Sequence, residues 1–169
     1  MTDVTEIDAS AAPDADDIFN RLVHVTNTTN FEVPITLHVR GVVTSGKLIS
    51  GATFWRESAA ELREQANGPR EAIEAMAEGF ERVAETYRTR YEASVPDPEQ
   101  QPRDAFVHLR DARTVTPEGA LPVSGSLWRA RVGSVDAFSL GELRMPPPER
   151  LSSSPGVPPA VERAGRGRG

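Results

Sequence analysis

Three histidines are the residues of this chain whose type best suits metal binding or acid–base chemistry: His24, His38 and His108. His38 and His108 lie in segments of alternating polarity, which predict strands, so their rings could meet across a sheet. A metal held by both would need a third ligand, such as Asp136 or Glu32. Because no spacing forces these side chains to converge, we interpret the histidines as strand-surface or partly buried residues and predict no metal site and no cofactor.

Two serines, Ser45 and Ser50, would be nucleophiles if a histidine lay beside them. Neither lies in a G-x-S-x-G elbow, and the Thr-Ser-Gly sequence around Ser45 is typical of a turn. The glycines nearby do not form a phosphate loop, because Lys47 is followed by a leucine in a predicted strand instead of a helix-opening serine or threonine. The sequence therefore predicts no enzymatic activity.

The stretch 31–55, FEVPITLHVRGVVTSGKLISGATFW, predicts two adjacent strands at 31–40 and 42–54. Apolar residues alternate along it, as in a strand with one buried face. Pro34 has no N–H to donate, so its amide position must face an open edge or a bulge. Three glycines interrupt the pattern and mark a turn, bulges or bends: Gly41, Gly46 and Gly51.

Helical segments are predicted at about 15–26, 57–66 and 70–91, the first and last from the spacing of apolar residues and the middle one from its composition. The last two form an insertion at 56–95 between the second and third strands. The longest helix carries an apolar stripe, which we expect to pack on the sheet, with partner binding as the alternative. The stripe consists of Ile73, Met76, Phe80, Val83, Tyr87 and Tyr91.

Strands return at 104–115, and the segment 116–125 is predicted to be a connection. The segments 126–132 and 134–144 are predicted to form a hairpin that turns at Gly133 and Ser134. Arg129 and Asp136 would lie on its two arms and form a cross-strand ion pair or a recognition site. We expect Trp55 and Trp128 to pack in the core, with an exposed anchor for self-association as the alternative.

These elements predict an α+β domain at 14–144: a small, strongly bent antiparallel sheet or partly open barrel of about five strands, with an N-terminal helix and an inserted helical segment. The acidic segment 1–13 and the Pro/Gly/Arg-rich tail 145–169 are predicted to be disordered. The strand order, with the glycine spacing at 41–48, resembles the Sm-like small barrel. That resemblance implies an alternative function, an oligomeric RNA-binding module.

The charge distribution argues against a broad nucleic-acid surface. Residues 144–169 carry about +3 and the remainder about −9, within a net charge of −6. An acidic body with a basic tail allows attraction between copies, so we expect homo-oligomers or clusters. The chain has no cysteine, no apolar run of membrane-spanning length and an N-terminus unlike a signal peptide. We therefore expect a cytoplasmic protein that contacts no membrane.

Three blocks of sequence share an order and spacing that points to a family. They are ITLHVRGVVTSGKLISG within 31–55, FVHLRDAR at 106–113, and LWRARVGSVDAFSLGEL at 127–143, which includes the pair Leu140-Gly141. Together they resemble the gas vesicle accessory protein U family (GvpU). This resemblance implies a cytoplasmic, gas vesicle-associated accessory protein without catalytic activity, whose partners are gas vesicle structural or accessory proteins. It implies a role in assembly, maturation or clustering.

Overall fold

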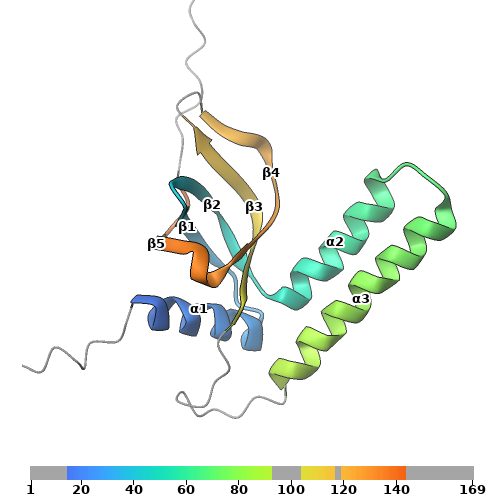
Figure 1. The fold of residues 1–169 in the computed structure, drawn as a ribbon, viewed down its shortest axis with the longest axis horizontal. Helices are drawn as coiled ribbons and strands as arrows, with labels where there is room; N and C mark the ends of the chain where they lie inside the picture. Colours follow the sequence, from blue (N-terminus) through green and yellow to red (C-terminus); the bar gives the residue numbers. More distant parts are fainter. Residues whose placement is uncertain (1–14, 93–103, 117–118, 144–169) are drawn as a thin grey trace, which may run out of the picture.

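A computed structural model describes residues 15–92, 104–116 and 119–143 of the chain (Figure 1). The α+β class, the N-terminal helix, the five antiparallel strands and the inserted helices are confirmed. The segments 1–13 and 145–169, predicted to be disordered, lie outside the described residues. In chain order the elements are α1 (Ala15–Thr29), β1 (Val33–Val39), β2 (Val42–Ile49), α2 (Gly51–Gln65), α3 (Arg70–Glu92), β3 (Phe106–Thr116), β4 (Gly119–Arg131), a 3-10 turn (Val132–Ser134) and β5 (Val135–Leu140).

The five strands form one open antiparallel sheet with the order β4-β3-β2-β1-β5. β4 and β5 lie at opposite edges, yet only the 3-10 turn Val132–Ser134 joins them. A flat sheet of five strands measures about 19 Å between its edges, whereas a connection of this length spans at most about 14 Å. The sheet must therefore curve until its two edges approach at this end, and the bent strands of Figure 1 show that curvature.

A line of three residues bends the sheet across β2, β3 and β4, and we call Gly46, Asp111 and Gly125 the bend line. The β2–β3 and β3–β4 pairings both shift register there, and Asp111 has a positive φ of 54°. A Cβ atom on Gly46 would lie 2.8 Å from the carbonyl oxygen of Arg110, and one on Gly125 would lie 2.7 Å from Cα of Asp111. The bulge in β3 therefore requires a glycine on each neighbouring strand.

The turn from β1 to β2 consists of Arg40 and Gly41, both with positive φ, at 50° and 81°. Two-residue hairpin turns of this hand match the twist of the strands that they join. The Arg40 N–H donates a hydrogen bond to Oδ2 of Asp136 at 2.6 Å, so β5 supports the turn. Gly41 therefore provides a tight turn, and Asp136 is one of its structural supports.

The other end of β1 explains how a proline fits a strand that has neighbours on both sides. Pairing between β1 and β5 begins at Ile35, and the Pro34 carbonyl accepts the Gly141 N–H at 2.7 Å. The missing N–H of Pro34 thus falls beyond the last residue pair of this ladder, and not at the open edge or bulge that was predicted. Gly141 has a φ of 104°, which an L side chain rarely adopts, and so ends β5.

The main core lies between α1 and the concave, apolar face of the sheet. Phe19 and Val23 of α1 are almost fully buried, and the Phe19 ring lies 5.2 Å from that of Phe138 on β5. No helix among the described residues is long and apolar enough to cross a membrane. The buried core cluster is Phe19, Val23, Val33, Ile35, Leu37, Leu48, Val107, Leu109, Ala112 and Val132.

The second strand is shorter than predicted, because a helix cap interrupts it. β2 ends at Ile49, and Ser50 caps α2 by accepting the Thr53 N–H at 3.1 Å. The prediction of a strand at 42–54 with a bend at Gly51 is therefore wrong. Gly51 is the first residue of α2, and a Cβ atom there would lie 2.2 Å from the Tyr87 ring. The inserted helices thus begin earlier than the predicted 56–95.

The last strands also differ from the prediction. Most of the segment 116–125 belongs to β4 and does not form a loop connection. The predicted hairpin of 126–132 with 134–144 is wrong, because β5 pairs with β1 at the far edge and β4 pairs with β3. The turn at Gly133 and Ser134 exists, but it carries the chain across the open end of the curved sheet, where Val132 is buried.

Substitution of Gly46 by alanine should destabilise the protein by about 1–3 kcal/mol, because the new methyl group meets the backbone of β3, which cannot rotate away. The free energy of unfolding in urea measures the effect. Gly133→Ala is the matched control, since a Cβ atom there meets nothing within 4 Å, and it should change stability by less than about 0.5 kcal/mol. Equal effects of the two substitutions would contradict the bend line.

Candidate functional site

The helices α2 and α3 form a hairpin that projects to one side of the sheet (Figure 1), and we call it the helical arm. The two helices approach through small side chains, since Ala59, Ala77 and Ala84 are at most 1% exposed. Arg63 on α2 donates to Glu74 through Nε and Nη2, and to Glu81 through Nη1 at 2.7 Å. The bond with Arg63 lowers the pKa of Glu74. These contacts fix α3 along α2.

Aromatic and cationic side chains fasten the base of the helical arm to the sheet. Trp55 of α2 is half-buried, with its ring 5.1 Å from that of Phe80 on α3. The Arg129 guanidinium of β4 lies 5.3 Å from the Trp55 ring and 3.5 Å from the Phe106 ring. Arg129 therefore makes cation–π contacts between β4 and the arm. The predicted ion pair of Arg129 with Asp136 does not form, since Arg129 lies on these two rings and the Asp136 carboxylate accepts the Arg40 N–H.

The second tryptophan lies elsewhere. Trp128 is half-buried against the main core, on the strand face opposite to that of Arg129. A further link between the arm and the sheet comes from Arg110 of β3, which donates to Glu57 of α2 at 2.6 Å and also bonds Glu32. Both carboxylates help raise the pKa of Arg110. The arm is thus held to the sheet by a cation on each of two strands.

Where α1, α3 and β3 meet, four polar side chains are enclosed, and we call them the polar junction: His24, Asn27, Tyr91 and Asp104. Asp104 Oδ1 accepts the Tyr91 hydroxyl and, at 3.3 Å, the Asn27 amide N–H. His24 Nδ1 lies 3.8 Å from Asp104 Oδ2. Asn27 also accepts the Gly51 N–H at 2.8 Å, so α1 holds the start of α2. The junction therefore positions both ends of the helical arm.

The polar junction shifts the titration of its members. Burial raises the pKa of Asp104 to about 6, although Arg90 and the Asn27 hydrogen bond act in the opposite direction. Burial lowers the pKa of His24, and the positive charge of Arg90 adds to this effect. Asp104 is only 6% exposed, so its ionisation places a negative charge away from water. The junction thus encloses a carboxyl group whose ionisation is disfavoured by burial, at the contact between α1, α3 and the start of β3.

His38 and His108, considered as histidines that could meet across the sheet, lie apart. His108 is 1% exposed and lies between the rings of Phe54, at 4.7 Å, and Tyr87, at 5.6 Å. Burial, with a contribution from Arg129, lowers the pKa of His108 to about 3, so the ring stays neutral. His38 is exposed at the turn end of β1, while His108 lies near the start of β3. His38 and His108 are therefore not placed to bind the same metal ion.

The two candidate nucleophiles have structural partners. Ser45 Oγ lies 3.0 Å from Thr36 Oγ1 and accepts the Leu143 N–H at 2.8 Å. Ser50 Oγ caps α2 and donates to Asn30 Oδ1 at 2.7 Å. Among the described side chains, no three His, Asp or Glu residues are placed to hold a metal ion. Ser45 and Ser50 therefore make structural hydrogen bonds at the positions considered for catalysis.

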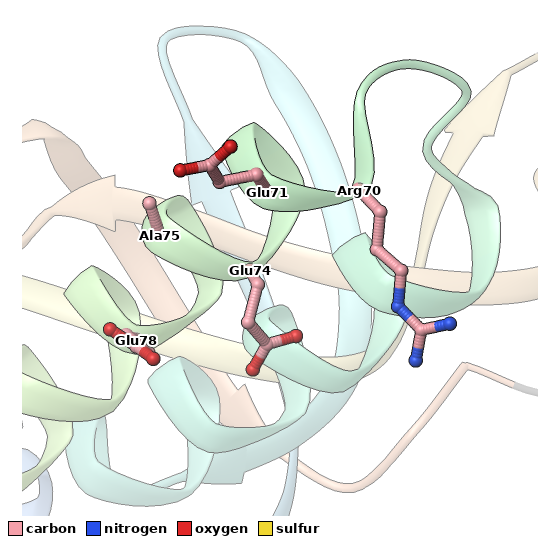
Figure 2. Close-up of a pocket in the computed structure, with 5 residues that line it drawn as sticks. All are labelled: Arg70, Glu71, Glu74, Ala75 and Glu78. Carbon is pink, nitrogen blue, oxygen red and sulfur yellow. The ribbon is translucent and has the colours of Figure 1, made fainter.

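An acidic hollow lies on the first turns of α3 (Figure 2). Its volume is about 510 Å³, and Glu74 in it is already bound by Arg63. Figure 2 shows Glu74 directed toward α2, with Ala75 on the opposite side of α3. Its lining residues are Arg70, Glu71, Glu74, Ala75 and Glu78. The carboxylates give the outer side of the arm a negative surface.

The apolar stripe predicted for α3 does not lie on one buried side. Phe80, Tyr87 and Tyr91 face the arm's interior or the polar junction, whereas Met76 is 56% exposed and Val83 37% exposed. Alanines, which the sequence interpretation passed over, provide the buried contacts with α2. The polar junction was not predicted either. Asp104 lies two residues before β3, and a single acidic residue at such a position does not indicate which side chains will bind it.

Comparison with known protein families gives a match over most of the chain. A family model described as gas vesicle protein GvpU-like matches residues 16–143. No curated protein sequence and no solved structure shows significant similarity to the chain. The matched range covers all the described helices and strands apart from the first residue of α1.

The polar junction predicts a pH dependence of stability. Because the pKa of Asp104 is about 6 when folded and 3.8 when free, the unfolded chain loses this proton first, and the contribution of Asp104 to stability should fall as the pH rises from about 4 to about 6. His24 and His108, whose pKa values are lowered by folding, act in the opposite direction, so the stability difference between the original chain and an Asp104 variant isolates this contribution. Asp104→Asn removes the charge but keeps an acceptor for Tyr91, so at pH 8 it should stabilise the protein by up to about 3 kcal/mol.

Urea unfolding at pH 4, 6 and 8 measures this effect. The control is Glu61→Gln on the exposed side of α2, which should leave the pH profile unchanged. An Asp104→Asn variant with the stability and the pH profile of the original chain would show that Asp104 is not held in the buried junction.

Proposed function

The chain belongs to the gas vesicle protein GvpU-like family, and we propose that it is an accessory protein of gas vesicles, a non-catalytic adaptor that supports their assembly, maturation or clustering. The observation that carries this proposal is the family match over residues 16–143. The family relates the protein to gas vesicles. The adaptor role is our inference from what the matched part of the chain presents.

The surroundings of the reactive residues support a role without catalysis. His108 is enclosed by aromatic rings, and Ser45 and Ser50 are engaged in hydrogen bonds that hold a strand end and a helix start. A catalytic base must reach the proton that it transfers. These side chains instead stabilise the sheet and the base of the helical arm. We therefore expect partners to bind to the exposed surface of the protein.

The charges and the projecting arm support an adaptor that also binds copies of itself. The helical arm extends from the sheet (Figure 1), and its outer side carries carboxylates beside exposed apolar side chains. The acidic body and the basic segment 144–169 have opposite charge, which favours attraction between copies. We propose that the protein acts in the cytoplasm, through self-association and contacts with gas vesicle structural or accessory proteins.

The alternative of an oligomeric RNA-binding module has weaker support. Affinity for RNA comes mainly from neutralised phosphates, and the acidic hollow on α3 would repel them. Filter binding across a salt series separates the two proposals. Salt-dependent RNA binding by the full chain would favour the alternative.

We expect the full chain to rise with gas vesicles during centrifugation, because intact vesicles are buoyant and a bound adaptor travels with them. The measurement is the fraction of purified protein recovered in the floating layer, with collapsed vesicles and bovine serum albumin as controls. Deletion of the gene should change the number, shape or distribution of vesicles seen by electron microscopy. Absence of co-flotation together with unchanged vesicles in the deletion strain would overturn the proposed function.

A further inference from the structure

Helix α3 has two apolar seams with the spacing of alternating three and four residues that suits helix pairing. The inner seam faces α2, the sheet and the polar junction, and its members are buried or half-buried. It consists of Ile73, Ala77, Phe80, Ala84, Tyr87 and Tyr91. The outer seam runs beside it on the side of α3 away from α2. It consists of Ala72, Met76, Gly79, Val83 and Thr86.

The outer seam is shaped for a close helix contact. Met76 is 56% exposed and Val83 37% exposed, while Ala72 and Thr86 are exposed as well. A Cβ atom placed on Gly79 would meet only the end of the Arg82 side chain, at 3.8 Å. The middle of the seam therefore has no side chain to hold a second helix at a distance, and a large apolar side chain lies on each side of it.

The charges beside the seam select its occupant. Glu78 and Arg82 lie one residue before Gly79 and Val83, with side chains 58% and 73% exposed. If two α3 helices met in parallel, the flank that carries Glu78 and Arg82 would lie beside the uncharged flank of the other copy, so neither charge would gain a partner. In an antiparallel pair with Met76 opposite Val83 of the other copy, each Glu78 lies beside the other copy's Arg82. The seam is thus complementary to itself in one orientation.

We propose that two copies of this chain associate through the outer seam, with their α3 helices antiparallel and crossing near Gly79. The contact is isologous, since the same surface is used by both copies. This inference rests on the self-association in the proposed function and identifies the surface that produces it. The helical arm, held together by Arg63 and bound to the sheet by the cation–π contacts of Arg129, presents the seam to one side of the sheet (Figure 1).

Sedimentation of the full chain at about 1–100 µM tests the surface. Met76→Lys with Val83→Lys should weaken association at least about tenfold, because it places four positive charges in the contact. The control is Val25→Lys, since Val25 is 48% exposed on α1, outside the seam, and this variant should associate like the original chain. Circular dichroism checks that each variant is folded.

Charge exchange tests the orientation. Glu78→Arg alone and Arg82→Glu alone should each weaken association about threefold to tenfold, since like charges then meet across the contact. The double variant restores opposite charges in the antiparallel pair and should regain the original affinity. An equimolar mixture of the two single variants should associate more strongly than either one alone.

The outcomes separate the seam from the wider proposal. If the original chain is monomeric throughout this range, both the seam and the proposed self-association are overturned. If it associates and the double lysine variant associates equally well, the seam alone is wrong, and another segment of the chain makes the contact. If lysines in the seam abolish co-flotation with vesicles while the original chain remains a monomer, the occupant is a gas vesicle protein and the proposal is overturned.

Discussion

The bend line is the constraint on which the rest of this structure depends. Asp111 adopts a positive φ in β3, and the strands on either side accommodate it with Gly46 and Gly125. This crease lets a five-stranded sheet curve enough for the three-residue turn at Val132–Ser134 to join its opposite edges. With β5 placed beside β1, Asp136 supports the turn at Arg40. A flat sheet would separate these contacts and uncover the core beneath α1.

The curved sheet also determines where the helical arm stands. Ser50 ends β2 and starts α2 within one residue, so the direction of the strand fixes the direction of the helix. Asn27 then binds the first amide of α2, and Asp104 receives the Tyr91 hydroxyl from the last turn of α3. The polar junction therefore holds the first residue of α2 and the last turn of α3. The opposite end of the arm, where α2 connects to α3, is positioned by packing between these two helices alone. The protein thus combines a firmly packed body with an arm that leaves one helix face uncovered.

The sequence predicted the features that local patterns determine, and it missed those that depend on distant partners. Alternation and glycine placement identified β1, its turn at Gly41 and the bend at Gly46. The helix start at Gly51 was missed because the apolar alternation of β2 continues into α2, and only the Ser50 cap marks the boundary. The predicted hairpin of 126–132 with 134–144 was wrong because a short turn usually joins neighbouring strands. Here the turn joins the two edges of a curved sheet, and that curvature depends on the positive φ of Asp111, which an aspartate in a sequence does not reveal. The family resemblance was confirmed, while the polar junction left no local pattern.

The pairing of β5 with β1 has a consequence for how the chain is made. Ile35 of β1 is paired with Leu140 of β5, the last strand to be synthesised. The edge of β1 that faces away from β2 therefore stays uncovered until β5 has been made. Such distant pairings slow folding, because the long intervening chain must be ordered first. Until residues 135–140 leave the ribosome, the nascent chain presents an uncovered strand edge beside apolar side chains, and premature pairing with another nascent chain is the main hazard. The edge of β1 is therefore covered only when synthesis of the sheet is complete.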